Sequence, residues 1–330
     1  MRRGVAASPA DTPLASDVPH REFTVLAGTA NPSLASAVAR ELGRPLGGCH
    51  VERFPDGELS VRLDETVRGR EVFVVQPTSP PVNDHLVELL AFADACRRAA
   101  AARFTAVVPY FGYARSDRRG CHRQPITASL VASLMERAGV DHVITVDLHT
   151  SQVEGFFHIP VDSLTAVPLV CDTVRDLAPA RELIVVSPDA GRVPMATEYA
   201  ARLDAPLAVL HKTRESGMET RVTHLVGDVH GRMCLLVDDM IATGGTLIES
   251  MKVLHEAGAA RECLVSASHG LLLDGAAGRL AEAGARQILV TDTVACPASD
   301  HPAVRVVSVA SLLAAAIHRQ LSDESLGDLY

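Results

Sequence analysis

The stretch LLVDDMIATGGTLIES, residues 235–250, joins an apolar run, two adjacent carboxylates and a glycine turn that leads into a helical pattern. The apolar residues of 233–237 are typical of a buried parallel strand, and Asp238 and Asp239 follow at its carboxyl end. Open α/β sheets bind their ligands outside the carboxyl ends of their strands. The stretch therefore predicts a parallel α/β sheet with a ligand site at the end of one strand.

A short loop of small and hydroxyl-bearing residues follows the two acids: Ala242, Thr243, Gly244, Gly245 and Thr246. Thr246 and Glu249 have the spacing of a capping box, which predicts a helix that begins at about Leu247. The backbone N–H groups at such a helix start, together with two threonine hydroxyls, form a cradle for a phosphate. Because carboxylates repel a phosphate, the two acids should face neutral hydroxyls. This favours a sugar phosphate over a plain capped helix.

Strand and helix patterns alternate through the rest of the chain, which indicates parallel α/β sheets. Strand-like runs occur at 23–28, 72–77, 104–110 and 142–150, and a helical pattern covers 125–138. The order strand, loop, helix, strand recurs at similar lengths from residue 72 and from residue 233, which favours two similar halves. We expect a disordered N-terminal extension over 1–20, an N-terminal domain over 21–167 and a C-terminal domain over 168–330.

The composition is that of a globular chain of 330 residues, with 47% hydrophobic and 22% charged residues. No apolar run approaches the roughly 20 residues of a membrane span. The net charge of -9 argues against general binding to nucleic acid or to anionic membranes. Seven cysteines are scattered singly without a C-x-x-C pair, as in reduced proteins, and no secretory signal begins the chain. We therefore expect a cytoplasmic protein with neither nucleic-acid nor membrane partners.

Two stretches of the N-terminal half have an ordinary structural reading beside a functional one. RFPDGELSVRL, residues 53–63, contains a Pro-Asp-Gly turn that by itself indicates a hairpin. PYFGYARSDRRGCHRQPITASL, residues 109–130, places four arginines within nine positions: Arg115, Arg118, Arg119 and Arg123. In an acidic protein this density indicates either an anion site or a salt-bridged surface.

Three further stretches place charged residues at the ends of expected strands. VDLHT puts Asp147 and His149 on one face if the strand period of two continues. VSPDAGR ends a strand at Asp189, and LHKTRESG carries Lys212 and Arg214 in what reads as an exposed basic turn. None of these stretches identifies a function by itself. Their order along the chain therefore has to be compared with the order of motifs in known families.

Taken in order across residues 21–320, these motifs resemble the family of ribose-phosphate diphosphokinases. The acid pair and the loop after it are shared with phosphoribosyltransferases, which consume phosphoribosyl diphosphate. The FPDGE match at 54–58 and the segment over 109–130, similar to the family's ATP segment, favour the diphosphokinases. The resemblance implies two phosphoribosyltransferase-like domains, each a mainly parallel sheet flanked by helices. It also implies transfer of the β,γ-diphosphoryl group of MgATP to the C1 hydroxyl of ribose 5-phosphate, which gives 5-phosphoribosyl 1-diphosphate and AMP for nucleotide biosynthesis.

The resemblance assigns roles to individual residues. Lys212 and Arg214 correspond to a catalytic pair on a flexible loop, and His149 and Asp189 to residues that bind Mg²⁺ with the triphosphate. ATP-binding positions are Phe54, Asp56, Gly57, Glu58, Arg115, Ser116, Asp117 and Arg118. Ribose 5-phosphate-binding positions are Asp238, Asp239, Ala242, Thr243, Gly244, Gly245 and Thr246. The family's FPDGE loop reaches the ATP site of a neighbouring subunit, so the resemblance also implies a homo-oligomer, at least a dimer.

The chain departs from the family pattern at several positions. Ser116 stands where the family usually has Gln, Ala242 replaces an Asp found in many members, and 192–195 replaces a small and basic run. Two alternatives remain: a phosphoribosyltransferase, and a catalytically silent regulatory subunit, although such a subunit should have lost Lys212, Arg214 or His149. A Walker-type kinase is excluded, because the sequence contains no G-x-x-x-x-G-K-[ST].

Overall fold

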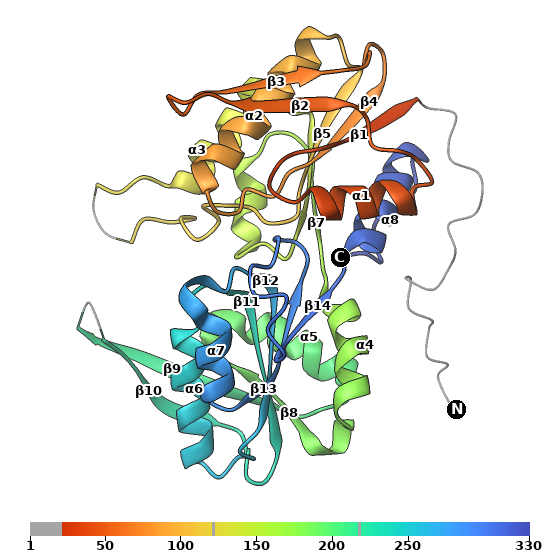
Figure 1. The fold of residues 1–330 in the computed structure, drawn as a ribbon. Coiled ribbons are helices and arrows are strands. Elements are labelled where there is room, and N and C mark those ends of the chain that lie inside the picture. Colours follow the sequence, from red (N-terminus) through yellow and green to blue (C-terminus); the bar gives the residue numbers. More distant parts are fainter. Residues whose placement is uncertain (1–21, 121–122, 217–218) are drawn as a thin grey trace. The chain divides into compact units, whose positions relative to one another are not determined.

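The structure is a computed structural model that describes residues 22–120, 123–216 and 219–330, with the backbone alone described over 212–223. The extension expected over 1–20 lies outside the described residues, as does Cys121. The chain forms two compact units (Figure 1). Of the described residues, the first unit contains 22–165 with 293–295 and 308–330, and the second contains the rest, within 166–292 and 296–307.

The first unit is built on a five-stranded sheet in which every strand pair is parallel. Its order is β1 (Phe23–Ala27), β4 (Glu71–Val75), β5 (Arg103–Val108), β6 (His142–Val146) and β7 (Val161–Leu164). The antiparallel pair β2 (Cys49–Arg53) and β3 (Leu59–Leu63) forms a separate hairpin. The loop of this hairpin is 54–58, so the hairpin predicted from Pro-Asp-Gly is confirmed.

Helices cover both faces of this sheet (Figure 1). Helices α2 (Val82–Arg98) and α3 (Thr127–Ala138) share one hydrophobic core with β1, β4, β5 and β6. Helix α1 (Pro32–Glu41) packs with α8 (Ala310–Leu321), and Gln320 Nε2 donates to Thr105 Oγ1 at 3.0 Å, which ties α8 to β5. Between α3 and β7 the chain makes the short helix η2 (Ser151–Phe156).

The second unit has a seven-stranded sheet, parallel except for one terminal pair. Its order is β10 (Glu219–Val226), β9 (Leu207–Ser216), β8 (Leu183–Ser187), β11 (Met233–Ile241), β12 (Cys263–Gly270), β13 (Ala285–Thr291) and β14 (Val304–Val307). Among the described strands of this sheet, only β9 and β10 pair in the antiparallel sense. The parallel α/β sheets predicted from the alternating pattern are confirmed in both units.

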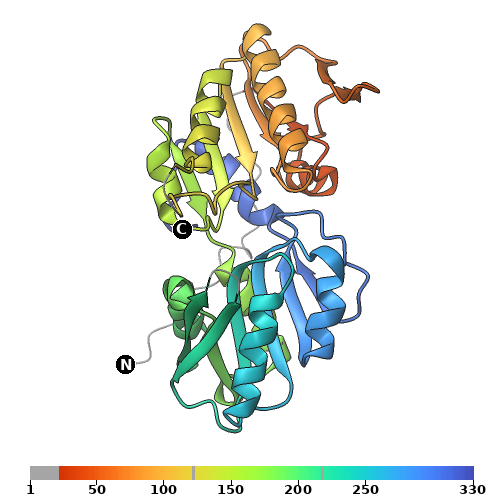
Figure 2. The ribbon, with the colours of Figure 1, turned by 90° about the vertical axis from the view of Figure 1, so that its left-hand side faces the viewer.

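Strand alternation supplies two cores in this unit, one on each face of the sheet. Leu235 and Val237 pack under α4 (Val167–Leu177) and α5 (Val193–Leu203), while Cys234 and Leu236 pack under α6 (Gly245–Glu256) and α7 (Ala276–Glu282). Figure 2 shows α6 and α7, in cyan and blue, against their face of the sheet. The short helices are η3 (Ala180–Glu182), η4 (Ala190–Arg192) and η5 (Leu273–Gly275).

Three sequence expectations need correction. Strand β11 runs to Ile241, so the two acids lie within the strand and not after it. Helix α6 begins at Gly245, and its N-cap Gly244 provides no side-chain bond, so the capping box at Thr246 does not form. Residues 308–330, expected in the C-terminal domain, belong to the first unit because α8 packs on α1 there.

The described residues carry no sign of a membrane span or a disulfide. No helix among them is long and apolar enough to cross a membrane. Cys96, Cys171, Cys234 and Cys263 are buried free thiols, and burial raises the pKa of each to about 12. These thiols act as small core residues, as their isolated positions in the sequence predict.

Candidate functional site

The acid pair of the second unit lies on β11, beside the loop that leads into α6. Asp239 is 1% exposed, and its backbone N–H donates to Asp238 Oδ1 at 2.9 Å. Two adjacent carboxylates in so little water are unfavourable unless cations or hydroxyl groups compensate them. The pair therefore requires a nearby positive group.

Arg192 supplies that positive group from the end of η4. Its Nε lies 3.6 Å from Asp238 Oδ1, and its Nη1 lies 3.4 Å from Asp239 Oδ1. Burial, followed by the neighbouring Asp239, raises the pKa of Asp238 well above its usual value, and Arg192 opposes this rise. The sequence singled out Arg192 only as part of the unusual 192–195 run, because nothing local predicts its contact with β11.

The loop between β11 and α6 has its carbonyl groups occupied and its helix N–H groups available. Leu273 N donates to Ala242 O at 2.9 Å, and Arg279 Nη2 donates to Thr243 O at 2.9 Å. The first N–H groups of a helix have no partner within the helix, and here they belong to the exposed turn at Gly245 and Thr246. The loop thus presents donors beside the helix dipole, an arrangement that binds anions.

Gly244 makes the tight entry into this helix possible. Its φ is 75°, in the left-handed region that side chains disfavour, and a Cβ built on it would lie 3.2 Å from Leu280 Cγ. A Cβ on Gly245 would meet no atom within 4 Å. The first glycine is therefore required by the backbone, whereas the second leaves open space in front of the helix.

Asp189 follows β8 and caps η4. Its Oδ1 accepts from Gly191 N at 2.8 Å and from Arg192 N at 3.2 Å. A carboxylate has about four lone-pair positions, so these two bonds leave capacity on Asp189 for a further ligand. The same carboxylate also fixes the backbone from which Arg192 extends.

The predicted catalytic pair lies on a strand and not in a loop. Lys212 and Arg214 belong to β9, where Lys212 is opposite Val222 and Arg214 is opposite Thr220 of β10. The ordinary interpretation of LHKTRESG as a basic turn does not apply to these residues, because antiparallel pairing extends β9 to Ser216. Positions 217 and 218 of that stretch lie outside the described residues.

In the first unit, the hairpin loop over 54–58 is exposed and internally bonded. Phe54 N donates to Glu58 O at 2.8 Å, and Glu58 N donates to Asp56 Oδ1 at 3.1 Å. Gly57 has a φ of 93°, which closes the turn. The ring of Phe54 is 41% exposed, so it is available to a planar partner.

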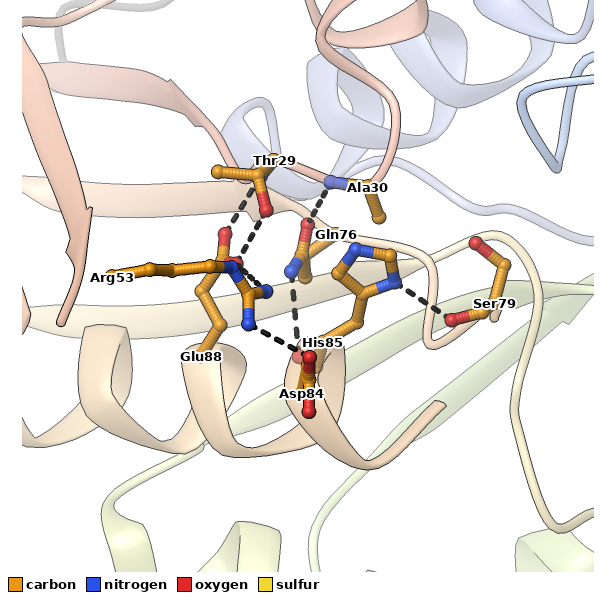
Figure 3. Close-up of polar contacts among 8 residues, drawn as sticks. All are labelled: Thr29, Ala30, Arg53, Gln76, Ser79, Asp84, His85 and Glu88. Carbon is orange, nitrogen blue, oxygen red and sulfur yellow. Dashed lines mark hydrogen bonds and ion pairs between the residues drawn. The ribbon is translucent and has the colours of Figure 1, made fainter. Parts of the chain in front are cut away.

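A polar network under this hairpin escaped the sequence reading (Figure 3). Glu88 of α2 is 0% exposed and accepts from Thr29 N at 2.6 Å and from Thr29 Oγ1 at 2.5 Å. Arg53 Nη2 lies 3.8 Å from Glu88 Oε2, and Gln76 Oε1 accepts from Ala30 N at 3.0 Å. These residues are far apart in the sequence, so only the fold brings them together.

The arginine-rich segment of the first unit separates into exposed cations and anchoring polar residues. Arg115 and Arg118 are exposed, whereas Asp117 is buried and accepts from Thr150 Oγ1 at 2.9 Å. Ser116 Oγ accepts from Thr127 N at 3.3 Å, at the start of α3. A hollow of about 1070 Å³ beside this segment is lined by Arg119, Arg123, Gln124 and Pro125.

The strand period does not continue to His149. Strand β6 ends at Val146, and Asp147 has a φ of 40° and accepts from Thr165 Oγ1 at 2.9 Å. The prediction that Asp147 and His149 share a strand face is therefore wrong. His149 is half-buried in the turn after β6, one residue before the Thr150 that binds Asp117.

Comparisons with known proteins agree with this geometry. The chain matches the family model for the N-terminal domain of ribose phosphate pyrophosphokinase over 23–139 and that for the phosphoribosyl transferase domain over 169–287. It is 46% identical over 308 residues to the ribose-phosphate pyrophosphokinase of Maricaulis maris, covering 93% of this chain and 99% of that protein. The chain belongs to the ribose-phosphate pyrophosphokinase family.

Other members extend this similarity. The ribose-phosphate pyrophosphokinase of Rhodopirellula baltica is 45% identical over 313 residues, 94% of this chain and 99% of that protein. The crystal structure of phosphoribosylpyrophosphate synthetase from Mycobacterium smegmatis gives a TM-score of 0.85 at 42% identity, covering 92% of this chain and 100% of that one. The two phosphoribosyltransferase-type domains expected from the resemblance are thus confirmed in this family member.

The residues of this pyrophosphokinase-family chain do not form a dense metal cluster. Among the described residues, no group of three or more His, Cys, Asp or Glu side chains is arranged to hold a metal ion. His149 belongs to the first unit and Asp189 to the second. Asp189 alone is the kind of donor that suits Mg²⁺, which keeps several waters and binds through one or two carboxylates plus substrate phosphates.

Proposed function

We propose that the chain transfers the β,γ-diphosphoryl group of MgATP to the C1 hydroxyl of ribose 5-phosphate. The products are 5-phosphoribosyl 1-diphosphate and AMP, and the first of these serves nucleotide biosynthesis. The observation that carries the proposal is the anion-binding helix start beside two acids, in a chain 46% identical to a ribose-phosphate pyrophosphokinase along nearly its whole length. An N-terminal pyrophosphokinase domain argues against a plain phosphoribosyltransferase.

Ribose 5-phosphate is assigned to the second unit. The 5-phosphate would accept hydrogen bonds from the loop formed by Ala242, Thr243, Gly244, Gly245 and Thr246. Asp238 and Asp239 would accept hydrogen bonds from the ribose hydroxyls. This division follows from charge, because the helix start favours an anion and the carboxylates favour neutral donors.

ATP is assigned to the exposed groups of the first unit. Phe54 offers a ring face to the adenine, with Asp56, Gly57 and Glu58 shaping the loop around it. Arg115 and Arg118 are exposed cations suited to the phosphate oxygens. Ser116 and Asp117 would fix the backbone that carries the two arginines, since their side chains bind Thr127 and Thr150.

Diphosphoryl transfer is mostly a matter of positioning and charge. His149 and Asp189 are each a candidate ligand for Mg²⁺ with the triphosphate, and the bound ion would neutralise part of the triphosphate charge. Lys212 and Arg214 would stabilise the charge that develops around the transferring group. Asp189 keeps lone-pair capacity for this role beside its two backbone bonds.

The setting of the reaction follows from the sequence and the family. We infer a cytoplasmic enzyme without nucleic-acid or membrane partners, consistent with the net charge of -9. We also infer a homo-oligomer, at least a dimer, because the exposed loop over 54–58 would serve a neighbouring subunit. Its exposure on the hairpin supports that role.

One assay tests the proposal. The purified chain is incubated with Mg²⁺, ATP and ribose 5-phosphate, with and without inorganic phosphate, and AMP and phosphoribosyl diphosphate are measured. We expect equal amounts of both products and none when ribose 5-phosphate is omitted. Absence of AMP under all conditions, with ribose 5-phosphate bound, would instead identify a silent regulatory subunit.

A further inference from the structure

Arg192 lies beside the two adjacent carboxyl groups of β11. Its side chain is 11% exposed, against 15% for Asp238 and 2% for Asp239. One guanidinium therefore lies within ion-pair distance of both carboxylates. A single guanidinium offsets only part of the negative charge that two carboxyl groups can carry.

The backbone aims this guanidinium at the acids. Asp189 Oδ1 accepts from Arg192 N at 3.2 Å, which fixes the residue at the end of η4. Helix α5 then begins at Val193, with a proline in its first turn. Proline presets the backbone of a helix start, so Arg192 extends from a segment fixed on both sides.

We propose that Arg192 is a positioning residue for the sugar: it holds the two acids in a fixed arrangement that accepts the ribose hydroxyls. The inference rests on the proposed function and deepens it. Without the guanidinium, the two carboxylates repel each other and also repel the incoming 5-phosphate dianion. A carboxylate has about four lone-pair positions, so the pairing with Arg192 does not by itself exhaust either acid, and less charge opposes the phosphate.

The run over 192–195 thereby gains a function in this chain. It departs from the family's usual small and basic residues, yet its first residue provides the cation that the acids need. A purely structural ion pair would affect stability alone. A positioning residue also affects the affinity for ribose 5-phosphate and the discrimination among sugar phosphates.

The test compares Arg192→Gln and Arg192→Lys with Arg202→Gln. Arg202 lies on α5 and pairs with Glu198 at 2.9 Å on the surface, so its variant removes one arginine from the same unit without touching the acids. Binding of ribose 5-phosphate is measured by calorimetry without ATP, and KM and kcat are measured for both substrates. We expect Arg192→Gln to raise the Kd and KM for ribose 5-phosphate by about 10- to 100-fold.

Other readouts separate positioning from folding. In Arg192→Gln, the KM for ATP should change by less than about twofold. Arg192→Lys should keep part of the affinity for ribose 5-phosphate, because an ammonium can pair with one acid but lacks the two-pronged geometry of the guanidinium. The preference of kcat/KM for ribose 5-phosphate over 2-deoxyribose 5-phosphate should fall in Arg192→Gln, because the acids no longer hold a fixed arrangement. Arg202→Gln should match the wild type in all these measurements.

Two results would overturn the inference. One is unchanged Kd for ribose 5-phosphate in a folded Arg192→Gln protein; the other is an equal rise in both KM values with unchanged sugar discrimination. Failure of the proposed function gives a different result from either of these, because the wild-type protein would then release no AMP. Calorimetry with ribose 5-phosphate alone still tests Arg192 in that case.

Discussion

Arg53 Nη1 lies 2.8 Å from Asp84 Oδ2, and this ion pair joins the end of β2 to helix α2 (Figure 3). Arg53 directly precedes the exposed loop over 54–58, and its other nitrogen lies 3.8 Å from the buried Glu88. Exposed ion pairs contribute about 0–1 kcal/mol to stability, so the effect of this contact is mainly on orientation. It sets the direction in which the hairpin presents Phe54.

Arg53→Gln should therefore affect ATP more than stability. We expect the KM for ATP to rise about three- to tenfold, while the free energy of unfolding changes by less than about 1 kcal/mol. Arg62→Gln is the matched control, since Arg62 pairs with Asp64 on the other strand of the same hairpin. Steady-state kinetics with each substrate varied gives the KM for ATP in both variants. An ATP KM in Arg53→Gln equal to that of the control variant would contradict the orientation argument.

The two glycines before α6 should respond differently to alanine. Gly244→Ala places a side chain at a φ of 75° and 3.2 Å from Leu280, so we expect the free energy of unfolding to fall by about 1–3 kcal/mol. Gly245→Ala adds a methyl group in open space within a helix, and should leave stability unchanged or raise it by up to about 1 kcal/mol. Urea unfolding of both variants measures this; equal losses would contradict the left-handed requirement at Gly244.

Elements with a strong local signal were predictable from the sequence. Strands β4 and β11 contain runs of consecutive apolar residues, 72–75 and 233–237, which both faces of a covered parallel sheet require. The acid pair with the glycine loop predicted a helix start close to where α6 begins, because that signal is local. The exact ends were not predictable: β11 continues through the two acids because pairing with β12 extends to Ile241.

Contacts made by the tertiary fold could not be read from the sequence. Arg192 is 46 residues from Asp238 in the sequence, yet its Nε lies 3.6 Å from that carboxylate. Thr29 and Glu88 are 59 residues apart and are joined by two hydrogen bonds. The packing of α8 in the first unit could not be predicted either. Helix α8 packs on α1, and no local sequence pattern indicates that contact. Local signals thus located the chemistry, and the fold supplied the residues that position it.

Lys212→Ala should remove a charge contact needed in the transition state. We expect kcat to fall by about 10²- to 10³-fold, as for the loss of an oxyanion-stabilising donor, with the affinity for ribose 5-phosphate nearly unchanged. Lys252→Ala is the control, because Lys252 lies on the surface of α6 and pairs with Glu249 at 2.7 Å. Initial rates of AMP formation measure the effect, and turnover equal to the wild type would remove Lys212 from the catalytic assignment.

The stability of the second unit should depend on pH through Asp238. Burial, followed by Asp239, raises the pKa of this carboxyl well above its usual value despite the opposing Arg192. A group with a raised folded-state pKa contributes stability that is fully present below its unfolded-state pKa. That contribution is lost as the pH rises through the folded-state value.

Asp238→Asn removes this ionisation with little change of shape. A buried carboxyl whose pKa is raised destabilises the folded state once it ionises, so we expect the variant to exceed the wild type in free energy of unfolding at pH 8. At pH 4, where the folded wild type holds the proton on Asp238, the two proteins should be nearly equal. Asp176→Asn, on the exposed surface of α4, is the control and should follow the wild type at both pH values. A difference between Asp238→Asn and the wild type that is the same at pH 4 and pH 8 would show that the buried carboxyl is not the group whose ionisation destabilises this unit.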